Sequence, residues 1–252
     1  MNSVKPLAST VAAKDRTLTR GRIPRNPILA LWSSEIGKKI VMALTGAVLV
    51  LFVLAHMVGN LKIFAGPTEI NTYSRFLRVV GEPELGYGQL LWIVRIILLA
   101  CVLLHVLAAY QLTRISHAAR PVGYKVKKDI ETTYAARLMR WGGVLLAVFI
   151  VFHILHFTLG YVGFKAGQFK DLAVYQNVVA GFSVWPVSLF YIVSMGALCL
   201  HLDHGIWSML QTLGWCTRQN TKTLRGLSRI LAIVVFLGFI SIPVAVMAGW
   251  LR

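Results

Sequence analysis

Acidic residues are scarce in this sequence of 252 residues, which has 9 Asp and Glu against 26 Lys and Arg and a formal net charge of +17. Charged residues make up only 14% of the chain, whereas a soluble domain usually carries about 25%. Hydrophobic residues make up 57%, and the mean hydropathy is +0.68. A basic balance can indicate a nucleic-acid or a membrane partner. Because the charges lie between long apolar runs, we expect an integral membrane protein and no nucleic-acid partner.

Cysteine is also rare, and no CxxC pair occurs among Cys101, Cys199 and Cys216. This argues against a disulfide framework, a zinc ribbon or an iron–sulfur cluster within the chain. The glycine motif of dinucleotide-binding folds is missing too.

Five apolar runs reach the length of about 20 residues that a helix needs to cross a bilayer. They span roughly residues 40–61, 90–112, 141–163, 187–210 and 229–251. Open sheets cannot satisfy their backbone hydrogen bonds in lipid. We therefore predict an all-α integral membrane protein, with a bundle of five transmembrane helices.

Basic residues predict how the chain is oriented, because positive loops stay in the cytoplasm. Eight precede the first run, seven lie between the second and third, and four between the fourth and fifth, against six on the other side. We expect the chain to lie in the inner (cytoplasmic) membrane, with its N-terminus in the cytoplasm. Residues 1–32 are predicted to be a basic cytoplasmic tail, partly disordered and not a cleavable signal, and residues 33–252 the membrane domain.

Histidines recur inside the apolar runs, where an ionisable side chain indicates function by default. His117 is predicted to lie in a solvated loop, and the others lie in the first four runs: His56, His105, His153, His156, His201 and His204.

Depth sorts these histidines into two levels. At a rise of 1.5 Å per residue, His56 and His153 lie roughly 18–24 Å from the cytoplasmic ends of their helices. His105 and His201 lie roughly 10–14 Å from theirs, so the levels are about 10 Å apart. Two imidazoles at one depth suit a bis-histidine haem, in which each ring gives one nitrogen to iron. Gly46 lies ten residues before His56, and Gly143 lies ten residues before His153. These two glycines could let a porphyrin lie against a helix.

A metal or proton transporter is the competing class, because "HILH" and "HLDH" each place two histidines on about one helix face. A transporter site gathers its ligands near one midplane, however. The division into two levels favours haem, and a purely structural role of the histidines is a third possibility.

Several segments resemble a known family in order along the chain. "SSEIGKKIVMALTGAVLVLFVLAHMVGNLKIF", "CVLLHVLAAY", "VFHILHF" and "YIVSMGALCLHLDHGIWSMLQTLG" are similar to the first four helices of the cytochrome b membrane-anchor subunit of succinate:quinone oxidoreductases and fumarate reductases. The resemblance is to the single-chain, five-helix, two-haem type and covers roughly residues 33–252.

This resemblance implies which histidines bind iron. It assigns the axial positions to His56, His105, His153 and His201, with His56 and His153 on the outer haem b and His105 and His201 on the inner one. His156 and His204 would then be residues that support a ligand, quinone-side residues or simply packed polar residues.

Four further polar residues are candidates for a role beside the cofactors. Ser34 and Lys38 resemble a quinone-proximal pattern, although a helix cap and a lipid-phosphate anchor are the favoured explanation of these two residues. Arg95 could pair with an outer haem propionate or extend to the interface. Asp203 could orient an imidazole or move protons.

The family implies that the chain passes electrons between an iron–sulfur subunit and menaquinone, while a flavoprotein subunit carries the succinate chemistry. It would be the quinone-reacting subunit of succinate dehydrogenase (respiratory complex II of the tricarboxylic acid cycle), with lipid, quinone and the two soluble subunits as partners and a higher oligomer possible. The basic face, including Lys125, Lys127 and Lys128, would dock the soluble pair. Fumarate reductase, another dehydrogenase such as a hydrogenase or formate dehydrogenase, and a histidine-based metal transporter remain as alternatives.

Overall fold

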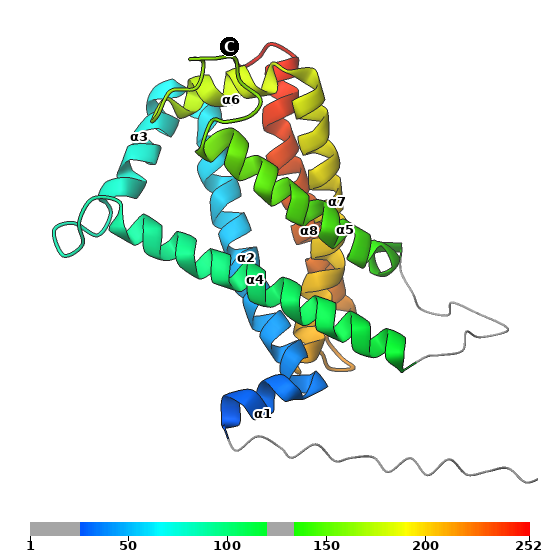
Figure 1. Ribbon diagram of the computed structural model, residues 1–252. Coiled ribbons are helices and arrows are strands. Elements are labelled where there is room, and N and C mark those ends of the chain that lie inside the picture. Colours follow the sequence, from blue (N-terminus) through cyan, green and yellow to red (C-terminus); the bar gives the residue numbers. More distant parts are fainter. Residues whose placement is uncertain (1–25, 120–133) are drawn as a thin grey trace, which may run out of the picture.

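The computed structural model describes residues 26–119 and 134–252, and these residues form helices and loops without a strand (Figure 1). Five long helices are apolar enough to cross a membrane. They are α2 (Glu35–Leu61), α4 (Gln89–Ala118), α5 (Tyr134–His153), α7 (Trp185–Thr212) and α8 (Thr221–Met247). The predicted all-α membrane bundle with five spans is therefore confirmed.

The helix ends differ from the predicted ones by several residues. The second span continues to Ala118, so His117 lies in the last turn of α4 rather than in a loop. Its side chain is nevertheless exposed, and it contacts a guanidinium nitrogen of Arg140 near the start of α5. Polar residues extend these helices beyond the five apolar runs, because a helix needs an apolar sequence only where it contacts lipid.

Short helices occupy the remaining described segments. The helix α1 (Pro27–Ser33) includes residues assigned to the tail, and its proline at the first position suits a helix start. The 3₁₀ turn η1 (Lys62–Ala65) leads into α3 (Pro67–Val79), the π-helical η2 (Ile154–Thr158) follows α5, and α6 (Val174–Phe182) precedes α7. The rest of the predicted tail, residues 1–25, lies outside the described residues, as do the docking candidates Lys125, Lys127 and Lys128.

The spans pack unevenly. Helices α2, α7 and α8 pack against one another, whereas α4 rests chiefly on α2 and α5 chiefly on α7. Figure 1 shows α4 and α5 tilted across the more upright α2, α7 and α8. Large apolar side chains such as Ile96, Leu99 and Leu103 on α4 are at least 60% exposed. Such surfaces suit a lipid environment and would be a liability in water.

The two ends of the bundle carry different segments. The helix α1 and the connection from α7 to α8 lie at one end, while α3, α6 and the C-terminus lie at the other (Figure 1). Side-chain contacts tie α3 to α6 at this second end, because Asn71 Oδ1 accepts a hydrogen bond from Tyr175 N at 3.0 Å.

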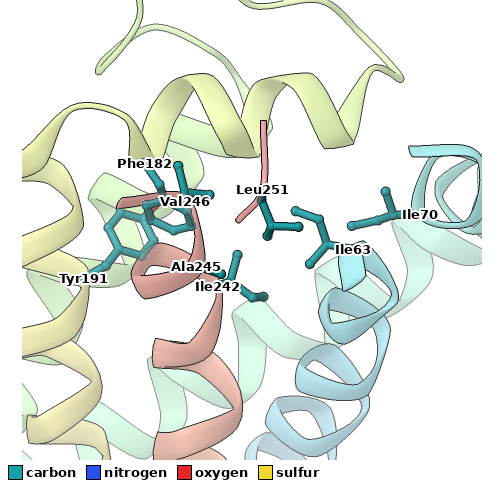
Figure 2. Packing of buried hydrophobic residues seen from close by; sticks show 8 residues of the cluster. All are labelled: Ile63, Ile70, Phe182, Tyr191, Ile242, Ala245, Val246 and Leu251. Atoms are coloured by element: carbon teal, nitrogen blue, oxygen red, sulfur yellow. The ribbon is translucent and has the colours of Figure 1, made fainter. Parts of the chain in front are cut away.

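Two buried apolar clusters hold the bundle. One lies at the α3–α6 end and is shown in Figure 2: Ile63, Ile70, Phe182, Tyr191, Ile242, Ala245, Val246 and Leu251. The other joins α2, α7 and α8: Met57, Leu202, Ile206, Leu210, Ala232 and Val235. The histidines lie beside these clusters.

Candidate functional site

Four of the buried histidines form two pairs, and each pair joins two different helices. His56 on α2 and His153 on α5 have ring centroids 5.8 Å apart. His105 on α4 and His201 on α7 have ring centroids 6.3 Å apart. These are the two pairs that the sequence predicts, and the helices that each pair joins are not each other's main packing partners.

The separations suit two imidazoles on one metal ion. A metal–nitrogen distance of about 2.0–2.1 Å, with roughly 1.1 Å from ring nitrogen to ring centre, gives centroids about 6.3 Å apart when the two rings lie on opposite sides of the ion. Both measured separations lie within about half an ångström of this value. The histidines meet in twos, and the described residues hold no group of three or more His, Cys, Asp or Glu side chains that could bind a metal ion.

The inner pair, His105 and His201, is anchored from α2. Nδ1 of His105 lies 3.1 Å from the backbone oxygen of Met42 and 3.3 Å from the hydroxyl of Thr45. A carbonyl can only accept, so Nδ1 of His105 carries the proton and Nε2 is left with a free lone pair. On the other ring, Nδ1 of His201 is buried without a hydrogen-bond partner.

The outer pair, His56 and His153, lies among aromatic rings. Phe52 stacks on His56 with centroids 5.3 Å apart, and Phe149 lies 5.7 Å from His153. Nδ1 of His153 lies 3.2 Å from the hydroxyl of Tyr191 on α7. Nδ1 of His153 is thus engaged, like Nδ1 of His105 in the inner pair.

The two pairs are about three helical turns apart. Thr45 contacts the inner pair and precedes His56 by eleven residues on α2, which is about 16 Å of helix. Tyr191 contacts the outer pair and precedes His201 by ten residues on α7, which is about 15 Å. The predicted spacing of about 10 Å was too short, because it was measured from helix ends that the apolar runs locate poorly.

The same spacing of ten to eleven residues explains the positions of Gly46 and Gly143, which precede His56 and His153 by ten residues. Both lie at the inner level, where a Cβ on Gly46 would come within 3.3 Å of His105 Cε1. A Cβ on Gly143 would come within 3.9 Å of His201 Cε1. They are thus the places where α2 and α5 pass the inner rings.

His156 lies close to the outer pair but is enclosed by protein. It is fully buried in η2, and a Cβ built on either Gly163 or Gly181 would lie 2.7 Å from its Nε2. Its Nδ1 lies 3.0 Å from the Tyr191 hydroxyl. Its Nε2 has no hydrogen-bond partner but faces the two glycines and not another histidine ring, so the position of His156 favours His153 as the ligand in "VFHILHF".

Asp203 is paired with arginine on the neighbouring helix and not with an imidazole. Its Oδ2 lies 3.0 Å from Nη2 of Arg225 on α8, and Arg225 Nη1 also donates to the Asp203 backbone oxygen at 3.0 Å. Arg229 approaches the other carboxylate oxygen at 3.7 Å. His204, one residue later, is half-buried and makes no hydrogen bond within the described segments.

The quinone candidates Ser34 and Lys38 are engaged at the start of α2. The Ser34 hydroxyl caps the helix by accepting from Gly37 N at 2.9 Å, and it donates to Leu31 O at 3.0 Å. The Lys38 side chain is buried, and its ammonium donates to Trp32 O at 2.7 Å. The structure thus gives Ser34 its helix-cap role and directs Lys38 toward α1.

Arg95 lies near the start of α4, with its guanidinium 5.0 Å from the ring centre of Trp92. It is half-buried and has no carboxylate partner in the part of the chain described. At the other level, a cavity of about 230 Å³ lies between α5 and α7. Apolar residues and His201 line it: Leu138, Met139, Trp141, Gly142, Leu145, Ala197 and Leu200.

Two residues of this site were not found from the sequence. Thr45 and Tyr191 look like ordinary members of apolar helices, and each contacts a histidine from 38 or 60 positions away in the chain. The sequence feature that could have indicated them is their spacing: each lies ten or eleven residues from a histidine on its own helix, which is the distance between the two levels.

Comparison with known proteins gives one match. Residues 118–240, just under half of the chain, match the family model described as "Succinate dehydrogenase/Fumarate reductase transmembrane subunit". The match begins at the end of α4 and runs through α5, α6, α7 and most of α8. It contains His153 and His201, one histidine of each pair. Neither the curated proteins nor the solved structures gave a match.

Proposed function

We propose that this chain is a dihaem cytochrome b of the family of succinate dehydrogenase/fumarate reductase transmembrane subunits, whose model its residues 118–240 match. In this role it passes electrons between the iron–sulfur subunit of succinate dehydrogenase and menaquinone. Members of this family are membrane subunits of a multi-subunit oxidoreductase. The succinate chemistry would belong to a flavoprotein subunit.

The observation that carries the proposal is the arrangement of His56, His105, His153 and His201 as two facing pairs, three helical turns apart. The donor set, one histidine from each of two helices at each level, would suit a b-type haem held by two neutral imidazoles. Each pair brings rings from two helices to a separation that suits one shared metal ion. A haem b at each level would supply one-electron redox chemistry within the membrane.

The protein's own contribution is to orient the rings. Met42 O and Thr45 hold His105 by Nδ1, and Tyr191 holds His153 by Nδ1. A ligating histidine that donates its second N–H in this way has a fixed tautomer and a fixed ring plane. The aromatic side chains around the outer pair exclude water from it.

The partner subunits would bind at the end that carries α1 and the α7–α8 connection. Exposed basic residues gather at the helix termini there: Arg114, Arg140, Arg218, Lys222 and Arg229. Positive loops are typical of the cytoplasmic side, where a soluble dehydrogenase would meet the anchor. Charge reversal at Lys125, Lys127 and Lys128, in the connection after α4, is expected to release the soluble subunits.

The proposal is tested by the haem content of the purified, folded protein. We expect a dithionite-reduced minus oxidised spectrum of b type and two haems per chain in a pyridine haemochromogen assay. His105→Leu and His153→Leu should each leave one haem, whereas His156→Leu should leave two. A folded protein without haem would overturn the proposal and favour a metal-binding role, which stoichiometric zinc would reveal. Copurifying subunits would distinguish succinate dehydrogenase from another dehydrogenase.

A further inference from the structure

The hydroxyl of Tyr191 lies between two imidazoles. It is 3.2 Å from Nδ1 of His153 and 3.0 Å from Nδ1 of His156. The tyrosine comes from α7, and the two histidines come from the end of α5 and from η2. A single phenol group therefore connects a predicted iron ligand to the one histidine of its level that is not positioned to bind iron.

A ligand role for His153 sets the direction of its hydrogen bond to Tyr191. A phenol donates only one hydrogen bond, so at least one of the two histidines must donate to the Tyr191 oxygen. If Tyr191 donated to Nδ1 of His153, the proton of that neutral ring would lie on Nε2, and Nε2 could then not bind a metal. A ligand at His153 therefore requires His153 Nδ1–H to donate to the Tyr191 oxygen, which leaves the Tyr191 O–H to donate to His156 Nδ1.

The surroundings hold the three groups in this arrangement. Tyr191 is only 6% exposed. Phe149 and Phe182 contact its ring edge to face, with centroids 5.1 and 4.9 Å away, and Phe182 lies beside it in Figure 2. The backbones of Gly163 and Gly181 enclose His156 on its other side. The phenol therefore has little freedom to turn away from either histidine.

The inner level is built differently. His105 donates to a backbone carbonyl, Met42 O, which no side-chain substitution removes. The outer ligand depends on side chains alone, and a hydrogen-bonded chain of side chains strengthens cooperatively when all its members are satisfied. Loss of the Thr45 hydroxyl would leave the Met42 carbonyl bond to His105 in place, whereas loss of the Tyr191 hydroxyl would leave Nδ1 of His153 without a partner.

We propose that Tyr191 is a positioning residue for the outer haem. Its hydroxyl oxygen accepts a hydrogen bond from Nδ1–H of His153, and its O–H donates a hydrogen bond to Nδ1 of His156. The inference rests on the proposed function. Hydrogen bonding at Nδ1 makes Nε2 a more basic ligand. A more basic ligand favours ferric iron, so loss of Tyr191 raises the midpoint potential of the outer haem and leaves that of the inner haem unchanged.

The test is a redox titration of the purified protein followed by visible spectra, together with EPR of the ferric haems. In Tyr191→Phe, the g-values and the midpoint potential of one haem should shift, the potential to a more positive value. His105→Leu, which lacks the inner haem, identifies the component that shifts as the outer one. Tyr175→Phe is the matched control, because it packs on the same cluster but makes no described contact with a histidine. Its two haems should behave as in the wild type.

His156 provides a second, independent pair of variants. His156→Gln keeps an acceptor for the Tyr191 proton and should retain the wild-type signature, whereas His156→Leu removes the acceptor and should shift the outer haem in the same direction as Tyr191→Phe. This pair decides the matter if Tyr191→Phe does not fold.

Unchanged outer-haem spectra in Tyr191→Phe, or in His156→Leu when that variant is the one available, would overturn the inference and leave the proposed function intact. A wild-type protein without haem would overturn both.

Discussion

Gly46 on α2 and His105 on α4 lie so close that a Cβ atom at position 46 would approach the ring carbon Cε1 to 3.3 Å. That distance is tighter than most real Cβ contacts, so the ring would have to yield by a few tenths of an ångström. The His105 ring also contacts Met42 O and the Thr45 hydroxyl, which lie on α2 as Gly46 does. A shift of His105 away from position 46 would therefore disturb these two contacts.

We expect Gly46→Ala to be less stable than Gly226→Ala. Alanine is favoured over glycine in a helix by about 1 kcal/mol, and a Cβ on Gly226 of α8 meets nothing within 4 Å. The control should therefore gain up to about 1 kcal/mol, while Gly46→Ala loses that gain to the contact with His105. Thermal unfolding in detergent measures both, and Gly46→Leu should also lack the inner haem. Equal gains at the two positions would show that His105 is not confined.

Ser34→Ala tests whether this serine is a helix cap or a quinone contact. Loss of an N-cap costs about 1 kcal/mol, and Ser34→Asp, which can still cap, should keep the stability of the wild type. If the hydroxyl serves only as the cap, the KM for quinone stays unchanged in both variants of the assembled complex. A KM that rises several-fold in Ser34→Ala with no loss of stability would assign the residue to quinone binding.

Removal of the Asp203 carboxylate should destabilise the α7–α8 contact. Its side chain and that of Arg225 are only 14% and 20% exposed, and a hydrogen bond to a charged group contributes about 1.5–3 kcal/mol. A double-mutant cycle of Asp203→Asn with Arg225→Gln should give a coupling energy in that range. Arg229→Gln is the control, because Arg229 is 62% exposed at 3.7 Å and should couple by less than about 1 kcal/mol. Equal couplings would contradict the assignment of Arg225 as the partner.

The predicted orientation can be tested with two introduced cysteines in a chain whose three native cysteines are replaced by serine. Ser183 follows α6, and Gln219 lies in the α7–α8 connection at the opposite end. Both side chains are exposed. In intact cells a membrane-impermeant maleimide should label Ser183→Cys and spare Gln219→Cys until the membrane is opened. The reverse pattern would place the N-terminus outside.

Much of the fold could be predicted from the sequence, because membrane helices can be recognised by the length and hydropathy of their apolar runs. All five spans were found, and the two pairs of rings are those expected. The helices α3 and α6 were missed, since neither is long enough to cross a bilayer and their stability comes from contacts such as that between Asn71 and Tyr175. The helix ends were displaced because polar turns continue a helix past the lipid-facing run.

The supporting contacts could not be predicted, because they join segments that are distant in the chain. Nothing near Tyr191 in the sequence points to His153 and His156, 38 and 35 residues away. The hypothesis that Asp203 could orient an imidazole or move protons relied on the histidines beside it in the sequence, whereas its carboxylate pairs with Arg225 of α8. Hydrogen-bond partners of this kind depend on how helices pack, which composition and periodicity do not record.

Helix α2 takes part in both levels, since Thr45 touches the inner ring and His56 belongs to the outer pair. Eleven residues turn a helix by about 1,100°, which is three full turns and about 20° more. A single residue inserted or deleted between them would swing His56 by about 100° around the helix axis. The hydropathy of the span would hardly change. This stretch should accordingly accept many apolar replacements in evolution while resisting any change in its length.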